Sequence, residues 1–233
     1  MDESLKELEL YNKDLFLLNK CKIVKNVIVQ FGRYQQEENG EVRPLKWRVL
    51  DVKSDKALLF CENIIASGVE HIFSPNTNKW EKIQIREWLN KNFYDEAFEK
   101  WEKDKINETI IDNSPKSANL YNNTKYFNDG INKYCTNKTL DKVFLLSIWD
   151  ITNPNYGFKN DIKGDSLRQK IPTKYVLKLE KSSLYALSSY YLRSPHHNYY
   201  FYGYCIESKN GCLRHGYSDD RRGIVPAIVI STK

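Results

Sequence analysis

The sequence has no apolar run long enough to cross a bilayer. Its longest runs, Val143 to Leu146 and Ile224 to Ile230, fall far short of the roughly 20 residues that a membrane-spanning helix needs. Residues 1 to 20 carry five acidic side chains and no unbroken apolar core, so they do not resemble a signal peptide. We therefore expect no membrane span, and a protein that stays in the cytoplasm or is carried on a virion.

A disulfide framework and a basic face are also missing. The five cysteines are odd in number and widely spaced, which favours reduced, partly buried thiols. The formal charge is +6, but Lys is spread along the chain and interleaved with Glu and Asp. This distribution is typical of a solvated surface and predicts no nucleic-acid partner.

What the sequence does contain is enough apolar material for a core. Of 233 residues, 41% are hydrophobic and 13% are aromatic, which excludes disorder and suits one domain with a small appendage. Leu5, Leu8, Tyr11, Leu15 and Leu18 recur at helical spacing, so residues 1–20 are predicted to form an amphipathic helix that packs on the domain. The domain itself is predicted to span residues 25–233.

Within that domain the hydrophobic period predicts an α+β fold with mostly antiparallel strands. A three-stranded meander is expected over 27–31, 47–52 and 57–65, followed by helices over 74–93 and 96–109 and a polar loop or insertion near 112–140. A buried strand is expected at 143–147. A helix over 166–179 is also indicated, although Pro172 argues against a continuous one. Strands 190–193, 199–206 and 224–231 close the domain, with a hairpin turn at 209–211.

Six short motifs resemble a bacterial family of domains of unknown function, the one numbered 6273. They occur in order, as Phe31 to Tyr34, Leu45 to Asp51, Lys56 to Leu59, Ile85 to Phe98, Asp141 to Ser147 and Tyr191 to Pro195, and the ending Gly223 to Ile228 is similar to that family's ending, with Val225 in place of Arg. The resemblance implies a C-type-lectin-like fold of the formylglycine-generating-enzyme type, with two main helices and a ligand-facing surface near the C-terminus. It implies no activity.

Cys205, Cys212, His196, His197 and His215 are close in sequence and raise the question of catalysis or metal binding. Formylglycine-generating enzymes use a cysteine pair in this region, but the flanking residues here do not match. The C-x6-C-x2-H spacing matches no common zinc pattern. No lectin-type calcium triplet is present, and Asp219 and Asp220 precede two arginines, which favours pairing or solvation. We expect no cofactor and no metal.

The C-terminal segment is rich in tyrosine and poor in one class of residues. Lys, Glu, Gln, Met and Trp make up 54 of 233 residues, yet between Ser194 and Thr232, where about nine are expected, only Glu207 and Lys209 occur. These five types cannot be encoded by codons ending in a pyrimidine. Diversity-generating retroelements randomise adenines in such codons, commonly in C-type-lectin folds. The residues that fit this pattern are His196, His197, Asn198, Tyr199, Tyr200, Tyr202, Tyr204, Arg214, His215, Tyr217, Ser218, Asp219 and Asp220.

The leading hypothesis is therefore a non-enzymatic scaffold that displays these residues to a macromolecular ligand, most simply a protein, because exposed tyrosine is favoured at recognition surfaces. It predicts that most of these side chains share one exposed face. Two alternatives stay open: the tyrosines fill the core and rim of a β-rich ending, or the domain has an enzymatic or regulatory role in which Cys205, Cys212 and a histidine converge.

Arg193 is predicted to be structural, and a set of core residues is predicted to be buried: Trp47, Trp88, Leu89, Phe144, Leu146, Leu192 and Ile228.

Overall fold

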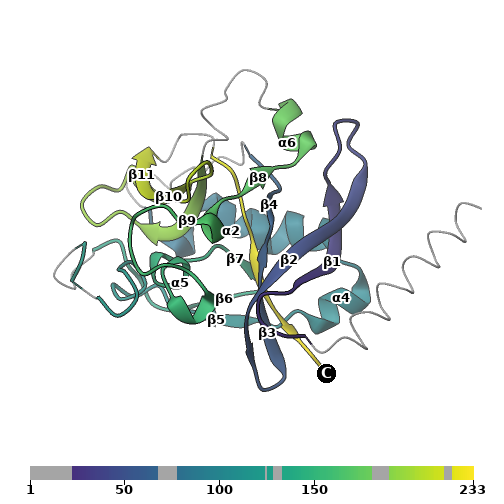
Figure 1. The fold of residues 1–233 in the computed structure, drawn as a ribbon, viewed down its shortest axis with the longest axis horizontal. Helices are drawn as coiled ribbons and strands as arrows, with labels where there is room; N and C mark the ends of the chain where they lie inside the picture. Colours follow the sequence, from purple (N-terminus) through teal and green to yellow (C-terminus); the bar gives the residue numbers. More distant parts are fainter. Residues whose placement is uncertain (1–22, 68–77, 124, 128–132, 180–188, 218–221) are drawn as a thin grey trace, which may run out of the picture.

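The computed structural model describes residues 23–67, 78–123, 125–127, 133–179, 189–217 and 222–233. In these residues the fold is mixed α+β, with antiparallel sheets and short helices, as the sequence predicts (Figure 1). No helix in these ranges is long and apolar enough to span a bilayer. The predicted helix over 1–20 and the predicted helix start at 74–77 lie outside the described residues.

The larger sheet has five strands in the order β1-β2-β3-β12-β7, and every neighbouring pair is antiparallel. Strands β1 (Ile28–Gln35), β2 (Val42–Lys53) and β3 (Lys56–Cys61) form the predicted meander. Strand β12 (Ala227–Ser231) lies between β3 and β7 (Val143–Phe144), as the yellow strand in Figure 1 shows. The closing strand begins three residues later than predicted, because Pro226 has no N–H to donate to a ladder.

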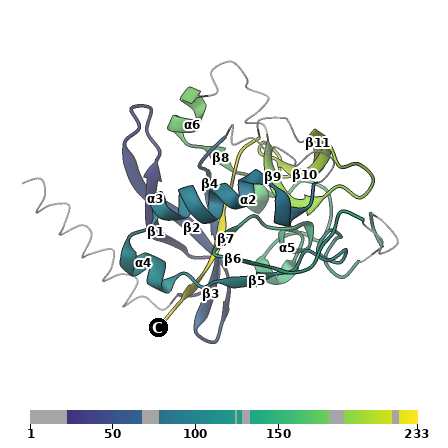
Figure 2. The ribbon, with the colours of Figure 1, turned by 180° about the vertical axis from the view of Figure 1, so that it is seen from behind.

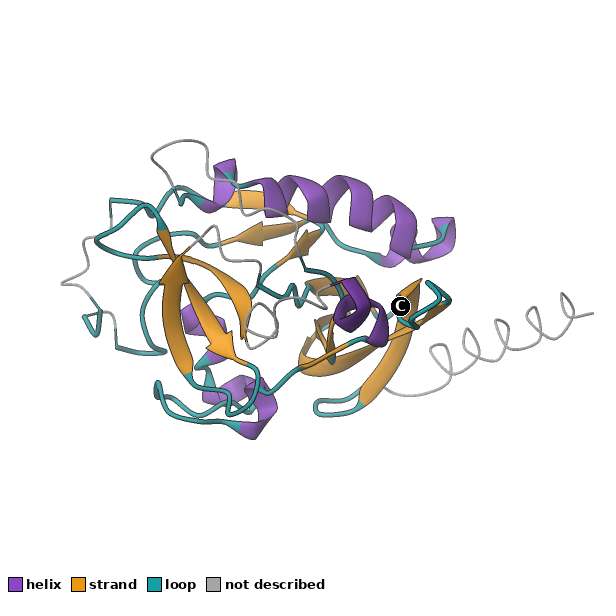
Figure 3. Ribbon diagram, turned by 90° about the horizontal axis from the view of Figure 1, so that it is seen from above, coloured by secondary structure: helices purple, strands orange, loops and turns teal. Residues whose placement is uncertain are grey.

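A helical layer covers one face of this sheet (Figures 2 and 3). It runs through η1 (Trp80–Lys82), α2 (Gln84–Trp88), η2 (Leu89–Phe93) and α3 (Tyr94–Ala97). The Phe93 ring centroid lies 5.2 Å from that of Tyr34 on β1, which anchors the layer to the sheet. Leu89 and Phe93 are fully buried, but the prediction of a buried Trp88 is wrong: its side chain lies partly exposed at the rim of the core.

The second predicted helix, 96–109, is shorter than its pattern indicates. Phe98 is extended, and the chain starts a new helix, α4 (Lys100–Lys105), that is capped by reciprocal bonds between Glu99 and Glu102. It ends at Ile106, whose backbone bridges to Ile230 of β12. The helical periodicity of residues 96–109 does not produce a continuous helix, because Phe98 turns inward to pack on Phe31 and Trp47.

The connecting segments form small elements around the two layers. β5 (Thr109–Ile111) pairs with β6 (Thr139–Asp141), and the predicted polar loop lies between them. The predicted helix over 166–179 is interrupted at Pro172, as its proline indicated: η4 (Ser166–Arg168) and α6 (Lys174–Leu179) flank β8 (Ile171–Pro172), which pairs with β4 (Asn63–Ile64). The remaining short helices are α5 (Ile148–Ile151) and η3 (Pro154–Tyr156).

The smaller sheet carries the tyrosine-rich segment. Its order is β11-β10-β9, from β9 (Ser189–Pro195), β10 (Tyr202–Glu207) and β11 (Leu213–Tyr217). The core beneath both sheets includes most of the predicted set, since Trp47, Leu89, Phe144, Leu146, Leu192 and Ile228 are all buried. The predicted strand over 199–206 begins only at Tyr202, because residues 196–201 form a turn.

Candidate binding surface

The β10–β11 hairpin brings the tyrosine-rich segment and the residues after Cys212 side by side, as predicted. Tyr202 lies opposite Tyr217, and Tyr204 opposite His215. Residues opposite each other in an antiparallel pair share a face, so these four rings point to the same side of the sheet. The hairpin closes at Gly211, which has a φ of +71°; a Cβ there would meet the carbonyl oxygen of Asp165 at 2.0 Å.

Rings from three segments meet on that face. We name this group the ring cluster: Phe127, His196, His197, Tyr199, Phe201, Tyr202, Tyr204, His215 and Tyr217. His196 lies at its centre, with its centroid 4.5 Å from His197, 4.9 Å from His215 and 5.4 Å from Tyr204. The rings thus form one contiguous group and not a set of separate side chains.

The ring cluster has a buried inner layer and an exposed outer layer. Tyr204 is 2% exposed and His196 is 5% exposed, whereas Tyr199 is 48% and Tyr217 is 53% exposed. The prediction that His196 lies on the exposed face is therefore wrong, because the rings of its neighbours cover its own. Tyr204 belongs to the core alternative, since its ring packs on Phe127 at 4.9 Å.

Most of the remaining candidates lie on the surface, and three lie outside the described residues. Asn198, Tyr200, Arg214 and His215 are exposed, while His197 and Tyr202 are partly exposed. Arg214 projects from the face opposite to the ring cluster, because it pairs with Cys205 in the register where Tyr204 pairs with His215. Ser218, Asp219 and Asp220 lie outside the described residues.

Two imidazoles of the cluster, those of His196 and His197, favour their neutral forms. Burial, followed by the neighbouring His197 and His215, lowers the pKa of His196 from 6.5 to about 4. Burial and His215 also lower the pKa of His197. The His197 Nδ1 lies 3.0 Å from the Tyr204 hydroxyl, whose pKa burial raises well above its ordinary value. At neutral pH the inner layer, His196 and Tyr204, is consequently uncharged.

A single asparagine that the sequence analysis missed positions the turn before β10. The Asn78 side-chain amide is buried and donates to the carbonyl oxygens of His196 (3.4 Å), Tyr199 (3.1 Å) and Tyr202 (2.8 Å). These three bonds fix the backbone that carries the outer rings. No local pattern could indicate this role, because Asn78 is more than 110 residues away in sequence.

The cysteine alternative finds no support in the geometry. Cys205 lies on the face opposite to His215, and the Cys212 thiol lies against Gly164, where a Cβ would be 3.8 Å from Sγ. Of the described cysteines, Cys61, Cys135, Cys205 and Cys212 are all free of disulfides. The described ranges also contain no group of three or more His, Cys, Asp or Glu residues that could hold a metal ion.

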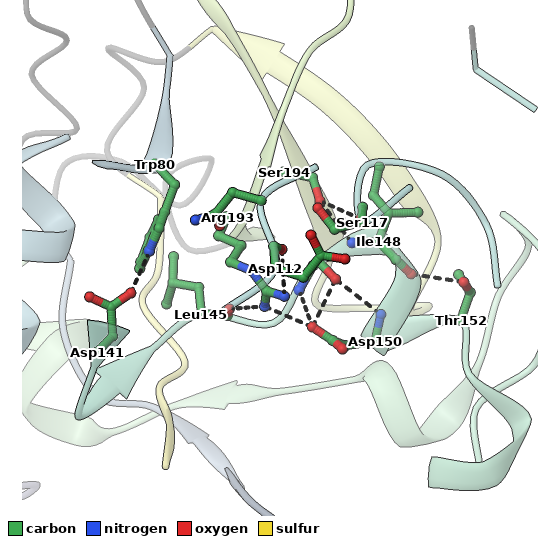
Figure 4. Close-up of polar contacts among 12 residues, drawn as sticks. Trp80, Asp112, Ser117, Asp141, Leu145, Ile148, Asp150, Thr152, Arg193 and Ser194 are labelled. Carbon is green, nitrogen blue, oxygen red and sulfur yellow. Dashed lines mark hydrogen bonds and ion pairs between the residues drawn. The ribbon is translucent and has the colours of Figure 1, made fainter. Parts of the chain in front are cut away.

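Arg193 of β9 bonds a backbone carbonyl and a carboxylate, as predicted, and so joins β9 to the segment after β7 and to α5 (Figure 4). Its guanidinium Nη1 donates to the carbonyl oxygen of Leu145 at 2.7 Å and pairs with Asp150 at 2.7 Å. Asp150 in turn caps α5 through Ser147. Ser194 completes the contact, since its hydroxyl accepts the Ile148 N–H at 2.9 Å.

A second buried carboxylate ties the helical layer to β6. Asp141 accepts bonds from Trp80 Nε1 at 2.8 Å, Arg86 Nε at 2.7 Å and Thr139 Oγ1 at 2.8 Å. Asn90 adds bonds to the backbone of Lys142 and Val143. The motifs that resemble a known family thus contain residues that bond one element of the scaffold to another. The ring cluster lies on this scaffold.

Comparison with known proteins gives one match. A model of the family described as a domain of unknown function (DUF6273) matches residues 54–232. No curated protein and no solved structure matches the chain.

Proposed function

We propose, from the premise that this chain belongs to the DUF6273 family of domains of unknown function, that it is a non-enzymatic binding scaffold whose ring cluster recognises a protein partner. The observation that carries the proposal is the outer layer: Tyr199, Phe201 and Tyr217 are large, exposed and in ring contact through Phe201. Contiguous exposed aromatic groups on a rigid support are typical of recognition sites.

The construction of the surface favours binding over catalysis. Its backbone is fixed by Asn78 and by two sheet partners, so little conformational entropy remains to be lost when a partner binds. Tyrosine and histidine rings provide contact area together with polar atoms at the edges, which suits a protein surface. The sequence motifs resemble a family for which a C-type-lectin-like fold is expected, and this fold is part of the proposal.

Diversification of the surface by a retroelement is the finer form of the proposal. It applies to the candidates that are exposed or partly exposed, His197, Asn198, Tyr199, Tyr200, Tyr202, Arg214, His215 and Tyr217, and to Ser218, Asp219 and Asp220 by sequence alone. His196 and Tyr204 do not suit free variation, because each is buried and in contact with several rings. A reverse transcriptase gene nearby, together with a near-copy of the 3′ end that carries adenines at the differing sites, supports this form; the absence of both rejects it.

Binding is tested with two matched triple variants. Tyr199→Ser, Phe201→Ser and Tyr217→Ser remove the outer rings, and Val42→Ser, Ile171→Ser and Leu177→Ser remove three other exposed apolar side chains elsewhere. A protein captured from the native host by the wild type is purified, and its affinity is measured against all three forms. We expect the first variant to lose at least about 100-fold in affinity, which corresponds to about 2.8 kcal/mol, and the second to bind as the wild type does. Equal binding by both variants overturns the proposal.

A further inference from the structure

A separate hollow of about 360 Å³ lies on the larger sheet, and no residue of the ring cluster lines it. Its apolar wall consists of Leu58, Ile111, Phe144, Leu146 and Val229, from β3, β5, β7, the segment after β7, and β12. Its polar end consists of Asp51, Asp150 and Tyr156, while Lys53 and Lys56 lie among its lining residues. A hollow with one apolar side and a few convergent polar groups is the usual form of a small-molecule site.

Two polar groups at this end have bonding capacity to spare. Three bonds go to Oδ2 of Asp150, from the Ser147 N–H and hydroxyl and from Arg193, whereas Oδ1 accepts none from the described residues. The Tyr156 hydroxyl likewise makes no hydrogen bond within the described part of the chain, although its ring is packed against the core. Both residues line the hollow, so this acceptor and this hydroxyl are available to a ligand that enters it.

The charge at the polar end selects the sign of that ligand. Arg193 directs its Nη atoms at the protein's own oxygens, those of Leu145, Asp112 and Asp150, and its Nε is buried without a partner. It therefore offers no accessible donor to an anion. Burial, Asp150 and Asp51 raise the pKa of Tyr156, so its hydroxyl stays neutral. Lys53 and Lys56 also line the hollow, but both side chains are exposed. Among the charged groups that act on the Tyr156 hydroxyl, the carboxylates of Asp150 and Asp51 act more strongly than Arg193, which favours a cation there.

Asp51 adds to this negative character. Its two oxygens pair with Lys25 at 2.9 Å and with Lys53 at 3.2 Å, and both lysines extend into solvent, with side chains 44% and 82% exposed. The Asp51 side chain itself is only 11% exposed, so it is the lysine ends of these pairs that water can reach. An ammonium group that enters the hollow can therefore share the Asp51 carboxylate without displacing a buried cation.

We propose that this hollow binds an aliphatic primary amine, with its ammonium group at Asp150 Oδ1 and the Tyr156 hydroxyl and its hydrocarbon chain on the wall of Leu58, Phe144, Leu146 and Val229. A primary ammonium has three N–H donors and no acceptor, which matches a polar end of oxygen atoms. The alkyl chain removes apolar wall from water, which supplies the nonspecific part of the affinity.

The test uses 3-methylbutylamine and, as the probe of opposite charge, 4-methylpentanoate, each titrated at pH 7 into the ¹⁵N-labelled full chain. We expect saturable shifts for the amine at residues 51–58, 109–112, 143–146 and 229, and none for the carboxylate. The absence of saturable binding, equal binding of both probes, or shifts centred elsewhere overturns the proposal.

Two variants locate the site. Tyr156→Phe removes only the hydroxyl, and we expect it to weaken amine binding about threefold to tenfold, the usual effect of one lost hydrogen bond. Val229→Phe fills the hollow, and we expect it to abolish binding, whereas Ile171→Phe introduces the same ring on an exposed strand outside it and leaves binding intact. If Val229→Phe fails to fold, Tyr156→Phe still decides: an unchanged amine affinity rejects the site.

Discussion

At the scale of single residues, His196 links the ring cluster to pH. In the unfolded chain it takes up a proton near pH 6.5, but in the folded protein only near pH 4, because burial and two neighbouring imidazoles oppose its charge. Between these pH values the unfolded state binds more protons, so stability falls as the pH falls through that window. We expect His196 to account for a loss of at most about 3 kcal/mol between pH 7 and pH 4.

Urea unfolding at pH 7 and at pH 4.5 measures this loss. Carboxylates titrate in the same range, so the comparison is with His196→Phe, which keeps a ring in the stack and has no proton to take up. The variant should lose less stability than the wild type over this interval. An equal loss in both proteins would mean that the charge of His196 is tolerated in the folded state.

Asp141 is the residue whose loss should cost most at this scale. Replacement by Ala leaves the buried Trp80 N–H without its acceptor and removes the buried carboxylate that pairs with the partly exposed Arg86. We expect Asp141→Ala to lower the free energy of unfolding by about 3–5 kcal/mol, as removal of one partner of a buried charge pair does. Asp95→Ala breaks the exposed pair with Lys103 and should cost under about 1 kcal/mol. Similar losses for both variants in urea unfolding would contradict this assignment.

At the scale of elements, the bend in β1 depends on Gly32. Its φ is +70°, the register of β1 and β2 shifts between Gln30 and Arg33, and a Cβ at Gly32 would lie 2.5 Å from the Phe98 ring. Gly40, in the β1–β2 turn, also has a positive φ of +82°, but the nearest atom to a Cβ there is 3.9 Å away. Substitutions at these two glycines therefore distinguish the cost of a positive φ, which both carry, from the cost of steric overlap, which only Gly32 carries.

We expect Gly40→Ala to cost about 1 kcal/mol, the price of a positive φ alone. Gly32→Ala carries the same strain and must also displace Phe98 or the helical layer, so we expect about 2–4 kcal/mol. Thermal and urea unfolding of both variants measure the difference. If the two variants are equally stable, the helical layer is free to shift away from β1.

The sequence predicts well those elements whose hydrophobic periodicity or turn residues all lie within one continuous segment. The meander through Trp47 and Leu59, the hairpin at Gly211 and the break at Pro172 all follow from local periodicity or turn chemistry. The strand start at Tyr202 and the break at Phe98 do not, because each is set by a distant partner: Asn78 in the first instance and the Phe31 region in the second. For the same reason the exposed rings could be predicted as a group, whereas the burial of His196 could not.

At the scale of the whole molecule, the predicted N-terminal helix remains a prediction. Leu8, Tyr11 and Leu15 form its apolar stripe, and such a stripe stabilises a helix mainly by packing. We expect deletion of residues 1–20 to lower the melting temperature of the protein in a thermal-shift assay. An unchanged value would mean that the stripe packs on something other than this domain, and a change of oligomeric state in sedimentation would identify a second copy as its partner.

The place of β12 inside the larger sheet also has a consequence for biosynthesis. This strand is the only ladder that joins β3 to β7 in the described part of the chain, and of the strands in that sheet it leaves the ribosome last. The meander, made nearly 170 residues earlier, therefore waits with the β3 edge unpaired until translation has passed Ser231. Nascent chains stalled before Ala227 carry that open edge, which makes them substrates for chaperones and proteases. Synthesis of β12 thus acts as a checkpoint, because a chain that stops before this strand cannot join β3 to β7.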